Sequence, residues 1–320
     1  TSGMCQWETD VADALDVCEH LDIPINTVDL TEEYWELVFQ DFLAKISEGR
    51  TPNPDVLCNK EIKFNTFKVK AQELGGDVIA TGHYAKIRHN SIGIELRKAS
   101  DKNKDQSYFL SSLRQNQLNN VVFPLGESDK QETRKLARIC GLKNHSKRDS
   151  TGICFIGKRK FRSFLAQYVA AKNGPIVDTE DRVIGEHKGA IFYTIGQRKG
   201  LGIGGTSYGN NSPWYVVDKI LVENKLVVGQ GSEHPALLST ALIASHVSWI
   251  LGPPGEFPFV CSAKIRYGQA DQPCEISEMP DNRIKVVFRS PQRAVTPGQS
   301  IVFYSGDICL GGASIEEKTK

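Results

Sequence analysis

The apolar residues of this 320-residue chain follow one spacing up to about residue 175 and another beyond it. In the first part, apolar side chains at i, i+3 and i+4 predict amphipathic helices, and short apolar runs predict buried strands. The helices are predicted over residues 10–21, 33–46, 60–74 and 128–140, and the strands over 25–30 and 77–81. In the last helix, Ser128 and Gln131 form the expected capping box. This alternation favours a parallel sheet covered by helices.

Beyond that point the chain consists of short β-type runs separated by Gly, Pro and Asn, a pattern typical of small barrels. The runs cover residues 183–184, 190–195, 214–219, 225–229, 241–249, 258–267, 283–289 and 300–304. We therefore expect an α/β domain over residues 1–158, a small β-rich domain over 159–230 and a C-terminal β-barrel over 231–320.

Composition excludes several classes of protein. With 40% hydrophobic and 24% charged residues the chain can bury a sizeable core, which excludes a wholly disordered, collagen-like or disulfide-scaffold protein. A membrane-spanning helix needs about 18 uninterrupted apolar residues. The best run, 241–251, is broken by Ser245, His246 and Ser248. We therefore expect no association with a membrane.

The net charge of +1 conceals an uneven distribution of charge along the chain. Residues 1–50 carry twelve acidic and two basic residues, whereas residues 133–162 carry ten basic residues and one acidic residue. A basic segment of this kind is either an ordinary solvated face or a surface that binds phosphates.

The eight cysteines do not follow a disulfide or zinc pattern. The sequence contains no Cys-x-x-Cys pair and no His-Glu-x-x-His motif, so no metal site is predicted. A chain of this length with scattered cysteines is typical of a reducing compartment. Four cysteines fall in apolar-periodic segments and are expected in the core: Cys18, Cys140, Cys261 and Cys309.

Two other segments combine a cysteine with polar chemistry. In residues 51–59 two prolines stiffen a predicted loop that presents Asp55 and Cys58 three residues apart. In residues 150–157, Cys154 is flanked on both sides by lysines and arginines, which favour the nucleophilic thiolate. The alternatives are a helix-linking turn with a structural cysteine at Cys58 and a small buried hydrophobe at Cys154.

Two glycine-containing segments are candidate ligand sites, and the sequence supports only the first of them. Gly82 and His83 directly follow the predicted strand 77–81, where ligands bind in open α/β sheets, although a structural histidine fits there equally well. Residues 200–205 formally match the G-x-G-x-x-G pattern, but the following residues are polar and lead into a strand. A dinucleotide site requires a helix there, so we reject that interpretation.

Taken together, these segments resemble the tRNA-specific 2-thiouridylases, the MnmA/TrmU family. The resemblance covers essentially the whole chain, in the family's order. The matching segments are TPNPDVLCNKEIKF at 51–64, ATGHYAK at 80–86, DKNKDQSYFL at 101–110, DSTGICFIGKRKF at 149–161, YTIGQRKGLGIGG at 193–205, PWYVVDK at 213–219 and TPGQSIVFY at 296–304.

The resemblance implies a reaction and a set of roles. In the family, ATP adenylates the 2-oxo oxygen of the wobble uridine of certain tRNAs, and a cysteine persulfide then delivers sulfur to the activated carbon. By resemblance, Cys154 carries the persulfide, Cys58 resolves it through a transient disulfide, Asp55 is the acid or base, and Gly82 lies at the nucleotide. The tRNA contacts implied are Asn53, Pro54, Asp55, His83, Lys104, Asp105, Gln106, Arg266, Tyr267 and Gln299. The basic segment 133–162 would hold tRNA phosphates, and the target base would be flipped into a pocket.

The sequence departs from the family in one respect. Members open with a strand and an SGGxDS-type phosphate loop within a PP-loop, Rossmann-like domain, and no such motif occurs here. We expect a truncated PP-loop domain, with Mg-dependent ATP use and a sulfur-relay or cysteine desulfurase donor implied for the whole enzyme. The location implied is the cytoplasm, with the mitochondrial matrix as the alternative.

Two alternative functions remain open at this point. One is a non-catalytic tRNA-binding fragment without ATP chemistry. The other is an iron–sulfur centre with Asp55, Cys58 and Cys154 as three ligands.

Overall fold

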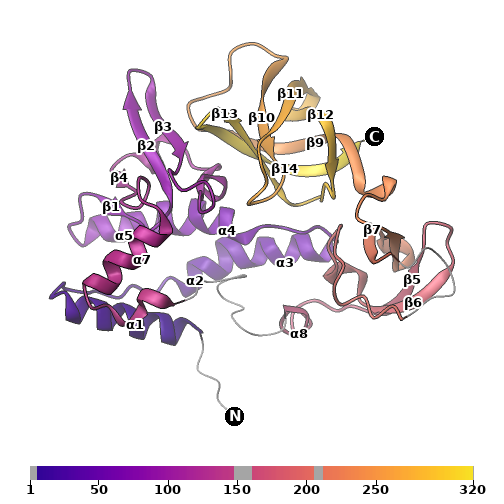
Figure 1. The fold of residues 1–320 in the computed structure, drawn as a ribbon, viewed down its shortest axis with the longest axis horizontal. Coiled ribbons are helices and arrows are strands. Elements are labelled where there is room, and N and C mark those ends of the chain that lie inside the picture. The colour runs from indigo at the N-terminus through magenta and orange to yellow at the C-terminus, as the bar shows by residue number, and fades with distance from the viewer. Residues whose placement is uncertain (1–5, 148–160, 205–211, 320) are drawn as a thin grey trace.

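The computed structural model describes residues 6–147, 161–204 and 212–319 (Figure 1). Helix α1 (Gln6–His20) is followed by an irregular segment and then by one continuous helix made of α2 (Thr31–Tyr34), the π-helix η1 (Trp35–Phe39) and α3 (Gln40–Ser47). The inward face of that helix buries Val38, Phe39, Phe42 and Ile46. The predicted strand at 25–30 is wrong, because this segment joins no ladder in the described sheets and so has no hydrogen-bonding partner.

A second continuous helix consists of α4 (Pro54–Leu57), the π-helix η2 (Cys58–Thr66) and α5 (Phe67–Glu73). It leads into strand β1 (Ile79–Ala80), which pairs in parallel with β4 (Val121–Val122). The predicted parallel, helix-flanked sheet is therefore confirmed in this part of the chain. Between these strands lie the short helices η3 (Ser107–Leu110) and α6 (Gln115–Leu118).

The hairpin β2 (Ala85–Asn90) and β3 (Gly93–Lys98) connects the first domain to the last one. Strand β3 pairs antiparallel with β14 (Ile308–Thr319), so the hairpin extends the sheet of the C-terminal domain. Leu96 and Leu110 share one buried core with Val302 and Tyr304 of that domain. The two domains are therefore packed as one body at this junction.

The next helices are α7 (Lys130–Ile139), η4 (Lys143–Ser146) and α8 (Phe161–Leu165). The capping box of α7 is formed by Asp129 and Glu132, not by Ser128 and Gln131 as predicted. The correction follows from helix geometry, because Asp129 has the extended backbone of an N-cap and its carboxylate accepts from the Glu132 amide.

The central domain is a four-stranded sheet in the order β6–β5–β8–β7. Its strands are β5 (Asn173–Val177), β6 (Val183–Lys188), β7 (Trp214–Ile220) and β8 (Lys225–Gln230). The predicted strand at 190–195 is wrong: a 3-10 turn, η5 (Ala190–Phe192), begins after Gly189, whose φ of +100° turns the chain. A further 3-10 turn, η6 (Leu221–Glu223), links β7 to β8.

The C-terminal domain is a β-barrel, as predicted, and the structure shows six strands that close into a ring. Its strands run in the order β13–β10–β11–β12–β9–β14, and the pairing of β13 with β14 closes the ring. Short turns η7 (Pro235–Leu237) and η8 (Pro280–Asn282) precede β9 and β12. The strands not yet given are β9 (Leu238–Trp249), β10 (Phe259–Lys264), β11 (Gln272–Met279), β12 (Arg283–Arg293) and β13 (Ser300–Ser305).

Figure 1 shows the barrel above α3 and α4, with the central sheet beyond the far end of α3. The three-part fold expected from the sequence is therefore confirmed. Within the described ranges, no helix has both the length and the apolar character needed to cross a membrane.

Candidate functional site

Asp55 and Cys58 lie at the beginning of the helix formed by α4 and η2. Asn53 is the N-cap, and its side-chain oxygen accepts a hydrogen bond of 3.1 Å from the Asp55 amide. Pro54 occupies the first helical turn, where its missing N–H costs nothing. The predicted stiff loop therefore ends at Asn53, and Asp55 and Cys58 are held three residues apart on one helix face.

The carboxyl of Asp55 is partly buried, and the cation of Lys63 acts on it. Burial raises the pKa of Asp55, and the positive charge of Lys63 opposes that rise. A carboxyl whose pKa is raised exchanges a proton more readily near neutral pH, which suits an acid or base. Lys63 was not singled out from the sequence. Its spacing of eight residues from Asp55, about two helical turns, was the available signal.

His83 follows β1 and is held on three sides. Its Nδ1 lies 2.8 Å from the Thr81 hydroxyl, and its ring centroid lies 5.8 Å from that of Phe64 and 6.0 Å from that of Phe123. Burial, together with the charge of Lys63, lowers the pKa of His83 to about 3. His83 is therefore a neutral imidazole at physiological pH, and Lys63 acts electrostatically on both His83 and Asp55.

Gly82 precedes this histidine and is exposed. A Cβ built on Gly82 would meet only Leu125 Cδ1, at 4.0 Å. The backbone at the end of β1 is therefore accessible, and the ligand contact expected at Gly82 stays a prediction.

The predicted tRNA-contact segment 104–106 supports this strand end. The Gln106 side-chain oxygen accepts from the Tyr84 amide at 3.0 Å, and the Gln106 amide donates to the Tyr84 carbonyl at 2.7 Å. Asp105 is only 6% exposed. It accepts a hydrogen bond from the Ser107 hydroxyl at 3.0 Å, and its carboxylate lies 3.8 Å from Lys264 Nζ. Asp105 therefore organises the turn that carries Lys104 and Gln106.

The barrel brings two further predicted contacts to the same helix. The ring of Tyr267 lies 4.5 Å from that of Phe109, whose carbonyl accepts a hydrogen bond of 3.0 Å from Asn59 Nδ2. The guanidinium of the neighbouring Arg266 donates to the Arg293 carbonyl. Tyr267 is thus linked through Phe109 to Asn59, the residue that follows Cys58.

The third barrel contact, Gln299, reaches the segment before the helix. Its Nε2 donates a hydrogen bond of 2.6 Å to the Thr51 carbonyl, and the Thr51 amide donates to the Pro297 carbonyl at 2.9 Å. Beside it, Arg50 forms an ion pair of 2.7 Å with Glu316. The barrel therefore fixes the approach to Asn53, Pro54 and Asp55.

A cavity of about 340 Å³ lies where α3, residues 52–57 and the barrel meet. Asn53 and Pro54 line it on one side and Ser300 and Ser314 on the other. At its rim, His246 has a left-handed φ of +51°. Asp55 and Cys58 are not among the residues that line this cavity in the described structure.

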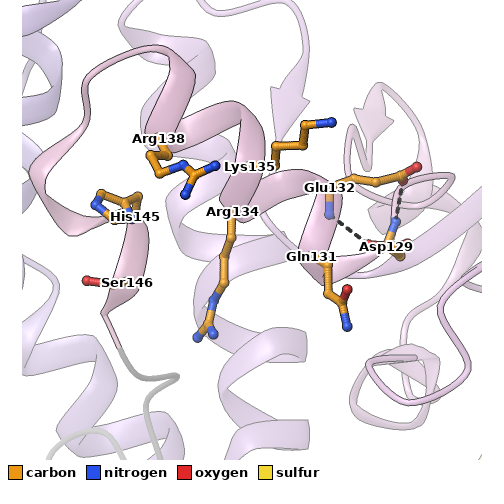
Figure 2. Close-up of a pocket in the computed structure, with 8 residues that line it drawn as sticks. All are labelled: Asp129, Gln131, Glu132, Arg134, Lys135, Arg138, His145 and Ser146. Carbon is orange, nitrogen blue, oxygen red and sulfur yellow. Dashed lines mark hydrogen bonds between the residues drawn. The ribbon is translucent and has the colours of Figure 1, made fainter.

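A second, open groove of about 560 Å³ follows α7 (Figure 2). Arg134, Lys135 and Arg138 contribute its cationic lining, and the side chain of His145 lies among them. The two acidic residues at its end, Asp129 and Glu132, are bonded to each other's backbone, as Figure 2 shows. The groove is therefore positively charged over most of its length.

The acidic and basic segments noted in the sequence partly neutralise each other. Lys143 pairs with Asp16 of α1, and Lys147 pairs with Asp10 and Asp13. One part of the basic segment is thus bound to α1, while Arg134, Lys135 and Arg138 face the groove.

Cys154 lies outside the described residues, and the structure gives no distance between it and Cys58. The described part of the chain contains no group of three or more His, Cys, Asp and Glu side chains that could hold a metal ion.

Comparison with known proteins assigns all three domains. Residues 1–158 match the family described as the tRNA methyl transferase HUP domain, residues 162–230 the tRNA methyl transferase PRC-barrel domain, and residues 239–315 the aminomethyltransferase beta-barrel domain. The tRNA-specific 2-thiouridylase MnmA of Psychromonas ingrahamii is 49% identical over 99% of this chain and 87% of its own length. The enzyme of the same name from Methylococcus capsulatus is 52% identical over 98% of this chain and 85% of its length. The chain therefore belongs to the tRNA-specific 2-thiouridylase family, MnmA.

Proposed function

We propose that this protein replaces the 2-oxo oxygen of the wobble uridine in tRNA with sulfur, in an ATP-dependent reaction. One arrangement carries the proposal. Asp55 lies at the beginning of a helix on which Lys63 also lies, and the charge of Lys63 acts on the Asp55 carboxyl. The segment that leads into this helix is held by a hydrogen bond from the barrel, donated by Gln299 to Thr51. The names of the relatives support the same reaction class.

The chemistry has two stages. In the first, the 2-oxo oxygen attacks the α-phosphorus of ATP, pyrophosphate leaves, and the base carries an adenylate on that oxygen. In the second, the terminal sulfur of a persulfide on Cys154 attacks C2, and AMP leaves with the oxygen. Cys58 then attacks the Cys154 sulfur, which breaks the sulfur–sulfur bond, leaves 2-thiouridine and forms a Cys58–Cys154 disulfide.

Asp55 is proposed to handle the proton in this sequence. Removal of the N3 proton makes the 2-oxo oxygen a better nucleophile, and a carboxyl of raised pKa accepts and returns such a proton. The positive charge of Lys63 opposes the rise in the pKa of Asp55 and so favours the ionised carboxylate, which is the form that acts as a base. Neutral His83 offers a hydrogen bond without adding charge beside the nucleotide.

Gly82 is proposed to lie against the nucleotide, because its exposed backbone leaves space for a ligand. The described residues provide no carboxylate cluster for Mg²⁺, so we assign none of them to that ion. ATP supplies the activation of the oxygen, and the side chains of this site orient the base and move its proton.

The tRNA is proposed to lie across the α7 groove and the barrel. Arg134, Lys135 and Arg138 would neutralise backbone phosphates, an attraction that depends on salt and not on sequence. The wobble base would be extruded toward Asn53, Pro54 and Asp55, with Tyr267 beside the path. A sulfur-relay protein or cysteine desulfurase would supply the persulfide, and we propose the cytoplasm as the site of action.

The experiment measures 2-thiouridine by mass spectrometry of tRNA nucleosides after incubation of the full-length protein with unmodified tRNA, ATP and a persulfide donor. The proposal predicts sulfur incorporation only when ATP is present. Tight tRNA binding without ATP-dependent sulfur incorporation would favour the tRNA-binding alternative. Iron and acid-labile sulfide in anaerobically purified protein would favour a cluster.

A further inference from the structure

Two cysteines that the proposed reaction does not use face each other in the barrel. Cys261 on β10 and Cys274 on β11 are directly opposed residues of an antiparallel pair, and their sulfur atoms lie 3.7 Å apart. Cys274 is buried at 4% exposure, whereas Cys261 is only partly buried. A reagent therefore reaches Cys261 first.

The backbone at this pair already suits a disulfide. Directly opposed residues of antiparallel strands have Cα atoms about 4.5–5.5 Å apart, inside the range of about 4.4–6.8 Å found in disulfides. The sulfur atoms need to approach from 3.7 Å to roughly 2.05 Å, which side-chain rotation supplies without a change in strand register.

The pair closes the hairpin that carries two of the expected tRNA contacts. Residues 262–273 lie between the two cysteines and include Arg266 and Tyr267. Within the same loop, Asp271 pairs with Lys98 of the first domain. A bond between the two strands would therefore restrain the loop next to Phe109 and the helix of Cys58.

We propose that Cys261 and Cys274 form a redox-active pair, which a low-molecular-weight disulfide such as oxidised glutathione converts to a bridge that restrains the loop of Arg266 and Tyr267. The bridge rests on the geometry of the barrel alone. Its effect on tRNA binding rests on the proposed function.

The exchange proceeds in two steps. Cys261, as thiolate, attacks one sulfur of the reagent disulfide, and one reagent thiolate leaves and takes up the proton that Cys261 lost. Cys274 then gives up its proton and attacks the Cys261 sulfur, which releases the second reagent thiol. The two cysteines lose two electrons, and the reagent gains them. Cys261 is the more exposed of the two and therefore starts the exchange, and the hydrogen bond with Cys261 together with burial raises the pKa of Cys274.

Tryptic mapping of the folded protein tests the bridge directly. Cleavage after Lys225, Lys264, Arg266 and Arg283 places Cys261 and Cys274 on separate peptides, 226–264 and 267–283. After treatment with oxidised glutathione we expect these two peptides to be linked, with the mass of two hydrogens lost. Dithiothreitol should separate them again. Persistence of a glutathione adduct on Cys261, or two unmodified peptides, would overturn the proposal.

Variants separate the pair from the other cysteines. Cys261→Ser and Cys274→Ser should each abolish the linked peptide, whereas Cys140→Ser, at an exposed cysteine on the C-cap of α7, should retain it. Circular dichroism checks that each variant is folded.

A second readout follows the loop. In the oxidised wild type we expect native-state trypsin cleavage after Arg266 to slow by roughly threefold, because the bridge removes local opening of the hairpin. The Cys261→Ser variant should show no such change. If cleavage slows while tRNA affinity stays the same, the bridge stands and the placement of tRNA on Arg266 and Tyr267 is wrong.

Discussion

Gln299 of the barrel donates a 2.6 Å hydrogen bond from its Nε2 to the carbonyl oxygen of Thr51, four residues before Asp55. The Thr51 amide in turn donates to the Pro297 carbonyl, so the segment is bonded to the barrel through both of its backbone polar groups. The position of Asp55, the candidate acid or base, therefore depends on the C-terminal barrel. The two bonded residues, Thr51 and Gln299, are 248 residues apart in the sequence.

Replacing Gln299 tests whether this residue positions the segment or contacts RNA. Gln299→Ala removes one neutral hydrogen bond, which is worth about 1 kcal/mol, and should lower kcat for thiolation. If Gln299 only contacts RNA, the substitution should instead raise KM for tRNA and leave kcat unchanged. Gln230→Ala is the matched control, because Gln230 Nε2 also donates to a backbone carbonyl, that of Ser212 at 3.2 Å, in the central sheet.

Gly298 offers a second test of the same contact. Its φ is +89°, and an added Cβ would lie 2.9 Å from both Arg50 Cβ and the Thr51 nitrogen. Gly298→Ala should therefore displace the segment before Asp55. We expect a clear loss of thiolation with only a small decrease in the melting temperature. Gly231→Ala is the matched control, because Gly231 has the same φ of +89° but an added Cβ there meets nothing within 4 Å. Equal effects of the two variants on thiolation would show that the displacement of Thr51 is unimportant.

Longer helices could be predicted where an apolar stripe repeats locally, as residues 33–46 show with Val38, Phe42 and Ile46, whereas the short helices α6 and α8 were not predicted. Helix starts were less predictable. Pro52 and Pro54 suggested a loop, although a proline at the first helical position is compatible with a helix, and the N-cap is Asn53. The prediction of a strand at 25–30 was wrong because a strand needs a hydrogen-bonding partner, which a local sequence pattern does not reveal.

Asp55→Asn should separate function from stability. A carboxyl whose pKa is raised in the folded state contributes stability below its unfolded pKa of 3.8, and that contribution is lost as pH rises through the folded pKa. At pH 7 the wild type therefore bears the cost of a charged, partly buried carboxylate, and the amide does not. We expect Asp55→Asn to abolish thiolation and to raise the melting temperature at pH 7. The difference in melting temperature should shrink as pH falls toward 3.8. An equally stable or less stable variant at pH 7 would contradict the burial of this carboxyl.

The electrostatics of the site were largely hidden in the sequence. Lys63 affects Asp55 and His83, and the latter is 20 residues further along the chain on another element. Such a relationship arises from tertiary packing, here the contact of the His83 and Phe64 rings. The basic segment was visible by composition, but only the structure separates the lysines bound to α1 from those in the groove.

The groove along α7 can be tested through the salt dependence of tRNA binding. Arg138→Ala should weaken binding of unmodified tRNA roughly fivefold, and should reduce the slope of log affinity against log salt by about one, if Arg138 neutralises one phosphate. Lys188→Ala, on strand β6 of the central sheet, removes an exposed cation outside both the groove and the barrel and should leave both quantities unchanged. Filter binding over a range of KCl concentrations measures both. An unchanged slope for Arg138→Ala would place the RNA elsewhere.

The most direct test of the account is the yield of 2-thiouridine from the full-length protein carrying Cys154→Ser, with Cys140→Ser as the control and with ATP and a persulfide donor supplied. If sulfur passes to the base through Cys154, the first variant yields no 2-thiouridine and the control matches the wild type. Wild-type yield from Cys154→Ser would show that another group delivers the sulfur.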